Sequence, residues 1–319
     1  MPNDNHDGDE TFPGRTYLYI RDNVLDSGGE PSPNALPQWL SPDIVVTPPG
    51  GAPGDDPREG LPNDVAITVR NRGGIAAMQV EVDVFVADPT TGWTSTTAFP
   101  VGSQPLDVPA YGSAVAHFTW TPIPGPIHRC MLARASLIIP PDTYSNSSIF
   151  DVVNDRHIAQ HNLNLVLMPA DKKSLSFAFM VVNPLGEKGE FILQADEIEP
   201  TAKNIDLLRA GVGCKFGQFG ETPLPAFGLT LSDPIDPQGK EKPETYGLVR
   251  EPRGDNMTIA NARRATMEIA MQADEVRRGV LTMERNPDTR PGDLHIMEIS
   301  QIDMRTKRAV GGLWIVLQH

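Results

Sequence analysis

Two histidines four residues apart are the first candidates for chemistry in this sequence. His157 and His161 occur in the segment HIAQH, and on a helix their imidazoles would share one face and could bind one metal ion. The segment lacks the glutamate that follows the first histidine in zinc hydrolases, and the other histidines are scattered along the chain. We therefore expect both histidines to be structural or solvent-facing, and we predict no metal site.

The acidic stretch NDNHDGDE, residues 3–10, matches a calcium-binding loop only in part. If Gly8 takes the sixth loop position, Asn and Asp side chains fall at the first, third, fifth and seventh positions. The twelfth position, which requires a bidentate glutamate, is then Gly14, and no flanking helices are predicted. We expect a solvated acidic tail with weak cation binding at most.

No pattern for nucleophilic catalysis is present in the sequence. The chain has no G-x-S-x-G elbow, and its two cysteines, Cys130 and Cys214, lie far apart. His128 would share a strand face with Cys130 and could activate its thiolate, but a buried cysteine in a strand is the commoner case. Nucleotide and nicotinamide fingerprints are also missing. We predict a protein without enzymatic activity, cofactor or catalytic residue.

Composition limits the class of partner and the compartment. A net charge of −14 opposes binding to nucleic acid and to anionic membranes. No apolar run approaches the roughly 20 residues that a membrane span requires. The first 14 residues lack the basic and apolar regions of a signal peptide. We expect synthesis in the cytoplasm, and an extracellular or assembly-associated destination stays open.

Turns and alternating apolar residues predict an all-β protein. The chain has 31 prolines and 28 glycines, and its 319 residues are enough for about two domains. In residues 78–88, MQVEVDVFVAD, four valines alternate with polar or aromatic residues, which buries one face of a strand and exposes the other. Further strands of the first half are expected at residues 43–46, 64–71, 113–121 and 128–138.

The segment NRGG, residues 71–74, would join two of these strands. One interpretation is a ligand-binding turn in which Arg72 grips an anion. We favour a simple connection in which Gly73 or Gly74 takes a positive φ and Asn71 bonds to local backbone. No helix start follows the segment, so it is not a phosphate-binding loop.

We divide the chain into an N-terminal arm of residues 1–36, a first β unit of residues 37–156 and a second β-rich unit of residues 157–319. A short helix fits residues 201–212, with Thr201 as its cap. The type of residues 259–278 stays open, because they alternate in places yet contain good helix formers. The last two strands are expected to form a closing hairpin. Strands of the second unit are expected at residues 162–168, 174–182, 190–195, 227–231, 279–284, 293–300 and 312–318.

Several phrases, taken in order, resemble the bacterial CARDB-like (cell-adhesion-related) immunoglobulin-type β-sandwich. They are YLYIRDN, EPSPNALPQWLSPDIVV, NDVAITVRNRGGIAAMQVEVDVFVAD, VPAYGSAVAHFTWTP, HRCMLARAS and NDRHIAQHNLNLV, and they span residues 15 to about 166. The resemblance implies a sandwich fold with a binding or structural role and no chemistry of its own. An antibody-type disulfide needs two cysteines in one sandwich, and the first unit has only Cys130. Its core should therefore rest on apolar packing of Trp39, Val69, Val82, Val84, Phe118, Trp120, Met131 and Leu132.

We predict two tandem immunoglobulin-like sandwiches that act through their surfaces. The first hypothesis is a structural or adhesive subunit of a larger bacterial or phage-related assembly, with protein partners that include a second copy of the chain. The arm segment TYLYIRD could then add a strand to a neighbour's sheet. The alternative is a carbohydrate- or surface-ligand-binding module that accompanies a hydrolase, and an enzyme in the second unit ranks last. The residues proposed for contacts are Tyr17, Tyr19, Arg21 and Arg72 for proteins, and Trp93, Tyr111 and Tyr144 for carbohydrate.

Overall fold

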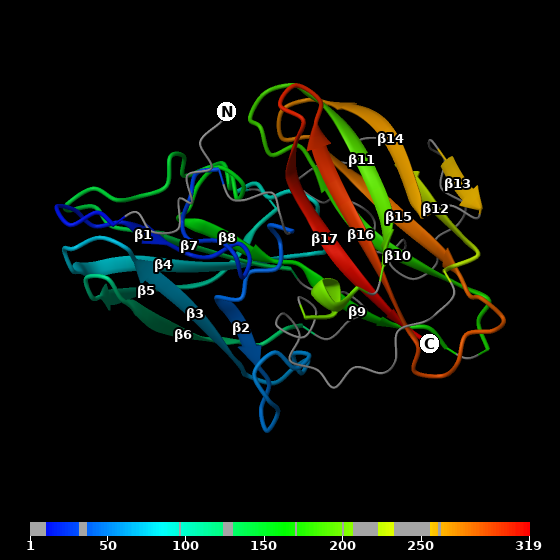
Figure 1. The fold of residues 1–319 in the computed structure, drawn as a ribbon, viewed down its shortest axis with the longest axis horizontal. Helices are drawn as coiled ribbons and strands as arrows, with labels where there is room; N and C mark the ends of the chain where they lie inside the picture. Colours follow the sequence, from blue (N-terminus) through cyan, green and yellow to red (C-terminus); the bar gives the residue numbers. More distant parts are fainter. Residues whose placement is uncertain are drawn as a thin grey trace.

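The computed structural model describes residues 11–31, 37–95, 97–123, 130–169, 171–199, 201–206, 223–232, 256–260 and 263–319. Within these ranges the regular elements are strands, apart from a short helix at residues 202–206. The strands build two β units that lie side by side (Figure 1). The predicted all-β class is thereby confirmed. None of the described helices is long and apolar enough to cross a membrane.

The first unit is a sandwich of two mainly antiparallel sheets. One sheet is centred on β3 (Asn63–Asn71), which pairs with β6 (Ser113–Trp120) on one side and with β2 (Ile44–Thr47) and β1 (Leu18–Tyr19) on the other. The other sheet has the order β5 (Phe99–Val108), β4 (Ala77–Ala87), β7 (Cys130–Ser136) and β8 (Ile158–His161).

The core of this sandwich follows the predicted alternation. Val80, Val82 and Val84 of β4 are fully buried, while Glu81 between them is exposed. All eight core residues expected from the sequence are buried. Cys130 is buried as well, and the core of this unit consists of packed apolar side chains. Cys214 lies outside the described residues, as do His128 and the acidic stretch 3–10.

The sequence analysis missed strand β5. Its residues FPVGSQPLDV contain two prolines and a glycine, which are unfavourable in the interior of a sheet. The structure places β5 at an edge, where β4 is its single partner among the described strands, so Pro100 and Pro105 need no partner on the open side.

The first unit also takes strands from beyond its predicted limits. β1 comes from the predicted arm, and Leu18 and Ile20 beside it are fully buried in the core. β8 comes from the predicted second unit and pairs with β7. The segment HIAQH is thus largely strand rather than helix. The division at residue 156 stays a prediction, but residues 158–161 complete the first unit's sheet.

The second unit again contains two sheets, which pack around one apolar core. Residues 264–271, which the sequence left open, form a strand. The predicted closing hairpin is confirmed, and the last strand also pairs in parallel with β9 (Leu163–Leu167). One sheet has the strand order β10 (Ser174–Val182), β15 (Val276–Glu284), β12 (Ala226–Leu231) and β13 (Asn256–Ala260). The other has the order β14 (Arg264–Met271), β11 (Gly189–Ile198), β16 (Leu294–Asp303), β17 (Arg308–Gln318) and β9.

The short helix follows β11. Thr201 caps it as expected, because its Oγ1 accepts a hydrogen bond from Asn204 N at 3.3 Å. The structure describes the helix for residues 202–206, and residues 207–212 of the predicted helix lie outside the described part of the chain.

A loop of the first unit docks on the second. Thr91 N donates to Met180 O at 2.9 Å, and Met180 N donates to Pro89 O at 2.6 Å, so this loop continues the edge of β10. The Thr91 hydroxyl also donates to Gln301 Oε1 at 2.6 Å, and both side chains are fully buried. A Cβ at Gly311 would overlap the Thr91 carbonyl, so the approach requires glycine there. The two units are therefore closely packed rather than loosely tethered.

Candidate functional site

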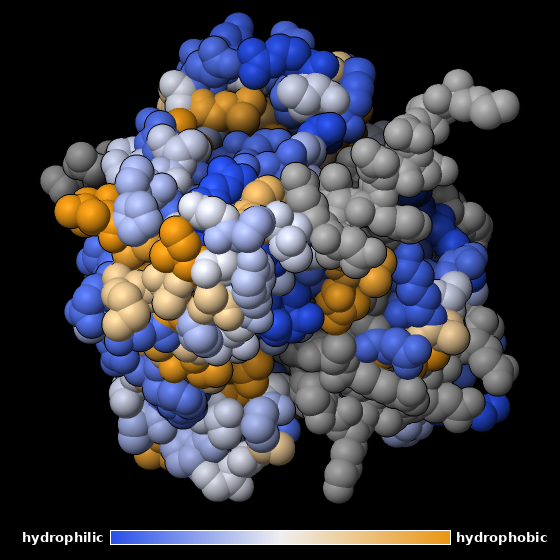
Figure 2. All heavy atoms as spheres, turned by 60° about the vertical axis from the view of Figure 1, so that its left-hand side comes forward, coloured by the Kyte–Doolittle hydropathy of each residue, from blue (hydrophilic) through white to orange (hydrophobic). Residues whose placement is uncertain are grey.

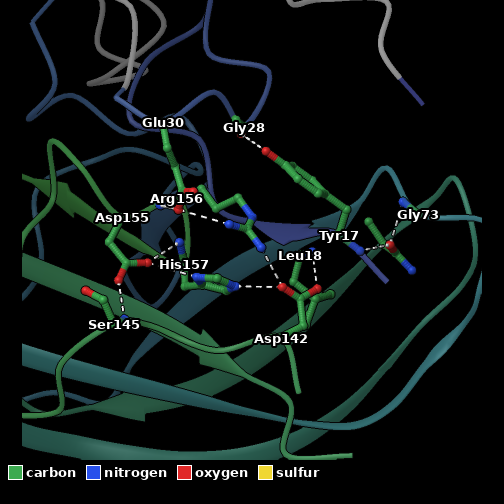
Figure 3. Close-up of polar contacts among 11 residues, drawn as sticks. Tyr17, Leu18, Gly28, Glu30, Gly73, Asp142, Ser145, Asp155, Arg156 and His157 are labelled. Carbon is green, nitrogen blue, oxygen red and sulfur yellow. Dashed lines mark hydrogen bonds and ion pairs between the residues drawn. The ribbon is translucent and has the colours of Figure 1, made fainter. Parts of the chain in front are cut away.

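A buried polar cluster lies where the N-terminal arm crosses the first unit (Figure 3). His157, at the start of β8, is 2% exposed and lies between two buried carboxylates. Its Nδ1 is 2.8 Å from Asp155 Oδ1, and its Nε2 is 2.9 Å from Asp142 Oδ1. Arg156 adds a second cation, 2.6 Å from Asp142 and 2.9 Å from Glu30. We call Glu30, Asp142, Asp155, Arg156 and His157 the arm latch.

The electrostatics of the arm latch favour a protonated histidine. Burial by itself would lower the pKa of His157, but the hydrogen bonds to Asp142 and Asp155 outweigh it and raise that pKa above its usual value. Burial would likewise raise the pKa of both carboxyls, yet hydrogen bonds from His157 and from backbone N–H groups lower it. The cluster is therefore an imidazolium held between two carboxylates.

The arm latch holds the arm against the sandwich. Asp142 Oδ2 accepts a hydrogen bond from Leu18 N at 2.7 Å, at the start of β1. The backbone of Arg156 accepts a bond from Ile20 N at 2.9 Å, and its guanidinium lies 4.2 Å from the centre of the Tyr17 ring. One group of side chains thus fixes both ends of β1 to the β7–β8 region.

The same side chains line a surface recess of about 510 Å³, which could admit a small ligand. Oxygen or nitrogen atoms of Glu30, Asp155 and His157 lie within 4.8 Å of one another, which is close enough for them to share a metal ion. However, both ring nitrogens of His157 are engaged by carboxylates, so the imidazolium has no lone pair to offer a metal. The geometry suits a structural ion cluster better than a catalytic base or a metal centre.

The arm residues proposed for protein contacts all contact their own chain. Tyr17 is 9% exposed and donates its hydroxyl hydrogen to Gly28 O, while Tyr19 is half-buried in β1. Arg21 forms a bidentate pair with Asp43, which Arg70 shares. In this conformation the arm completes its own sheet and is not presented to a neighbour.

Arg72 also binds within the chain. Its Nη1 donates to Ser27 O at 2.6 Å, and its guanidinium lies over the rings of Phe12 and Tyr17. These contacts favour the simple interpretation of the NRGG segment, in which Arg72 is not an anion hook.

The glycines of NRGG are required for a reason that differs from the prediction. Asn71 bonds to local backbone as expected, through Gly73 N and Ile75 O. Neither Gly73 nor Gly74 is among the described residues with positive φ, so that expectation was wrong. A Cβ on Gly73 would instead overlap the backbone of Arg15 and Thr16. The glycines permit the close approach of the arm.

The three aromatic residues proposed for carbohydrate do not share one environment. Trp93 is 1% exposed, and its indole donates to Gln160 Oε1 at 2.6 Å, so no ligand reaches it from the surface. Tyr144 is half-buried, with the Arg134 guanidinium 4.4 Å from its ring centre. Tyr111, at the β5–β6 turn, is 55% exposed and is the one of the three open to a ligand.

Sequence reasoning found one member of the arm latch and missed its partners. His157 was considered as a metal ligand together with His161, whose Nδ1 instead contacts Ser41 O at 3.0 Å. The closeness of Asp155 and His157 in the sequence was the available signal, because the turn before β8 brings side chains two residues apart together. Asp142 carried no such signal, since it lies beyond a turn after β7.

Comparison with known proteins gives structural alignments of low identity and low TM-score. No family model matches the sequence, and no curated protein matches it. A CARDB domain from Pyrococcus furiosus, in complex with di-metal ions, aligns with 50% of this chain and 96% of its own at 10% identity and a TM-score of 0.27. The collagen adhesin of S. aureus aligns with 90% of this chain and 96% of its own at 8% identity and a TM-score of 0.24.

An adhesin of enterotoxigenic E. coli, from CFA/I, aligns with 98% of this chain and 89% of its own at 7% identity and a TM-score of 0.25. These TM-scores are too low for any of the three likenesses to support an argument about ligands or activity.

Proposed function

We propose that this chain is a non-enzymatic structural or adhesive subunit of a larger bacterial or phage-related assembly, and that the free end of its first unit is a docking surface. The observation that carries the proposal is an exposed apolar group at that end. Ile138 and Ile139 are 75% and 85% exposed, Met78 is 58% exposed and Ile75 is 43% exposed. We call these four residues the apolar end.

Strand pairing supports treating the apolar end as one surface. β4 and β7 are antiparallel, and Glu81 pairs with Ser136, so the residues before β4 and after β7 come to the same end of the sheet. Figure 2 looks onto this side of the molecule and shows apolar side chains gathered between polar ones. Clusters of large exposed apolar residues on soluble proteins commonly mark interaction sites.

The architecture suits a spacer with a docking end. The two units are packed against each other through the Thr91 loop, and the apolar end lies at the other end of β4 from this contact. The Asp142–His157–Asp155 ion cluster holds the arm against the first unit close to that end. Ile75 of the apolar end and Pro140, which follows Ile139, line the same recess as the cluster.

The test is the mass of the purified full-length chain by native mass spectrometry and light scattering, alone and with its cellular extract. We expect self-association or capture of a large partner, and we expect the double substitution Ile138→Asp and Ile139→Asp to abolish it. Leu167→Asp is the matched control, because Leu167 is 66% exposed on β9 of the second unit. A strict monomer that captures no large partner would contradict the proposal.

A further inference from the structure

On each of three neighbouring strands of the second unit, the row of side chains that faces the core ends in a residue that can bind a metal ion. The row of β11 ends in Glu197, that of β16 begins with His295, and that of β17 continues to His319 just beyond the strand. The neighbouring residues of each row are apolar and at most 1% exposed. The apolar row members are Phe191, Leu193 and Ala195, then Met297 and Ile299, then Leu313, Ile315 and Leu317.

Strand register brings the three row ends together. Ile198 pairs with Ile296, which makes Glu197 and His295 diagonal neighbours on one face of the β11–β16 pair. Leu294 pairs with Gln318, which brings His319 beside the start of β16. The rings of His295 and His319 lie with centroids 5.0 Å apart at an interplanar angle of 79°.

These groups are buried and incompletely satisfied. His295 is 4% exposed and Glu197 is 7% exposed. Among the described residues, His295 Nε2, Glu197 Oε2 and both ring nitrogens of His319 are buried without a hydrogen-bond partner. Buried polar atoms in folded proteins nearly always have a partner, so several unsatisfied atoms at one place indicate a bound group.

The hydrogen bonds that do form orient His295 as a metal ligand. His295 Nδ1 lies 3.1 Å from Glu197 Oε1, and the same oxygen accepts a bond from Leu224 N at 3.0 Å. A carboxylate that holds Nδ1–H leaves the Nε2 lone pair free, which is the usual arrangement behind a metal-bound histidine. The ring of His319 packs edge-on against that of His295, and neither of its nitrogens has a hydrogen-bond partner among the described residues, so it can supply a second nitrogen ligand.

We propose that His295 and His319 together bind a divalent transition-metal ion of the zinc class, with Glu197 orienting His295 and offsetting the charge of the ion. Imidazole nitrogen suits zinc, copper and nickel rather than calcium or magnesium. The carboxylate keeps its bond to His295, and water completes the coordination. The metal site closes one end of the second unit's core and is independent of the apolar end.

The experiment uses the full-length chain, freed of metal with a chelator and titrated with zinc chloride by calorimetry. We expect one zinc ion to bind per chain. His319→Gln should abolish this binding, and Glu197→Gln should weaken it about tenfold through loss of the orienting bond. Copper(II) titrated instead of zinc should give an electron paramagnetic resonance signal with coupling to imidazole nitrogen, which His319→Gln reduces.

Two histidine variants serve as controls. His117→Gln removes an exposed histidine, and His157→Gln removes the one in the arm latch, so both should keep the zinc affinity of the unaltered chain. His319 directly follows β17, and the melting temperature of the His319→Gln variant reports whether the fold is kept. Absence of zinc binding by the unaltered chain, or unchanged affinity in folded His319→Gln, overturns the proposal.

Discussion

The arm latch makes the stability of the first unit depend on pH in two opposite directions, one set by His157 and the other by Asp142 and Asp155. The pKa of His157 is raised in the folded chain, so the stabilisation it gives is full below the ordinary value of 6.5 and is lost as pH rises through the folded pKa. The pKa values of Asp142 and Asp155 are lowered, so their contribution is full above 3.8 and is lost as pH falls through the folded values. The arm latch should be strongest between these limits.

His157→Gln tests this dependence. Near the middle of that pH range the substitution should lower the free energy of unfolding by about 3 kcal/mol, because buried Asp155 loses its cation and Asp142 keeps only Arg156. The variant should also lose the decline in stability on the alkaline side. Denaturant unfolding at a series of pH values measures both effects, with His117→Gln as the exposed control. An alkaline decline of equal size in His157→Gln would assign that decline to another group.

The turn between β3 and β4 links two elements of the first unit to the arm. Gly73→Ala places a Cβ about 2.7 Å from Thr16 Cα and carbonyl carbon, both of which are backbone atoms that cannot rotate away. We expect a loss of about 2 kcal/mol in the free energy of unfolding and faster proteolysis of the arm. Gly14→Ala is the control, because a Cβ there meets nothing within 4 Å. Equal protease resistance in both variants would show that the arm does not depend on this contact.

The strands that could be predicted are those whose own residues carry the pattern. The valines of β4 alternate cleanly, and their burial follows from the sequence alone. β5 was not predicted as a strand because its prolines are tolerated only at the edge of a sheet, and the edge position is set by the rest of the fold. β1 and β8 were seen as segments but assigned to the arm and to the second unit, because pairing over long separations leaves no local signal.

The candidate sites show the same limit. His157 is visible in the sequence, but Asp142 reaches it only through the turn after β7. Glu197 and His295 each end an alternating apolar row that can be read locally, yet only the strand register reveals that they are neighbours.

At the level of the whole molecule, the docking of the Thr91 loop should make the two units unfold together. Gly311→Ala would place a Cβ against the Thr91 carbonyl and open this contact without altering either core. We expect one calorimetric transition for the unaltered chain and two separate transitions for the variant. Gly14→Ala again serves as the control. Two transitions in the unaltered chain would mean that the interface adds little cooperativity.

The parallel pairing of β9 with β17 has a mechanical consequence. β9 leads directly out of the first unit at Asn162, and its residues 163–167 pair in register with residues 314–318. A pull between the first unit and the end of β17 acts on opposite ends of these two parallel strands. The load is therefore a shear that strains all their hydrogen bonds at once, instead of unzipping them one by one. Tension along that line would therefore be resisted by all five residue pairs of β9 and β17 together.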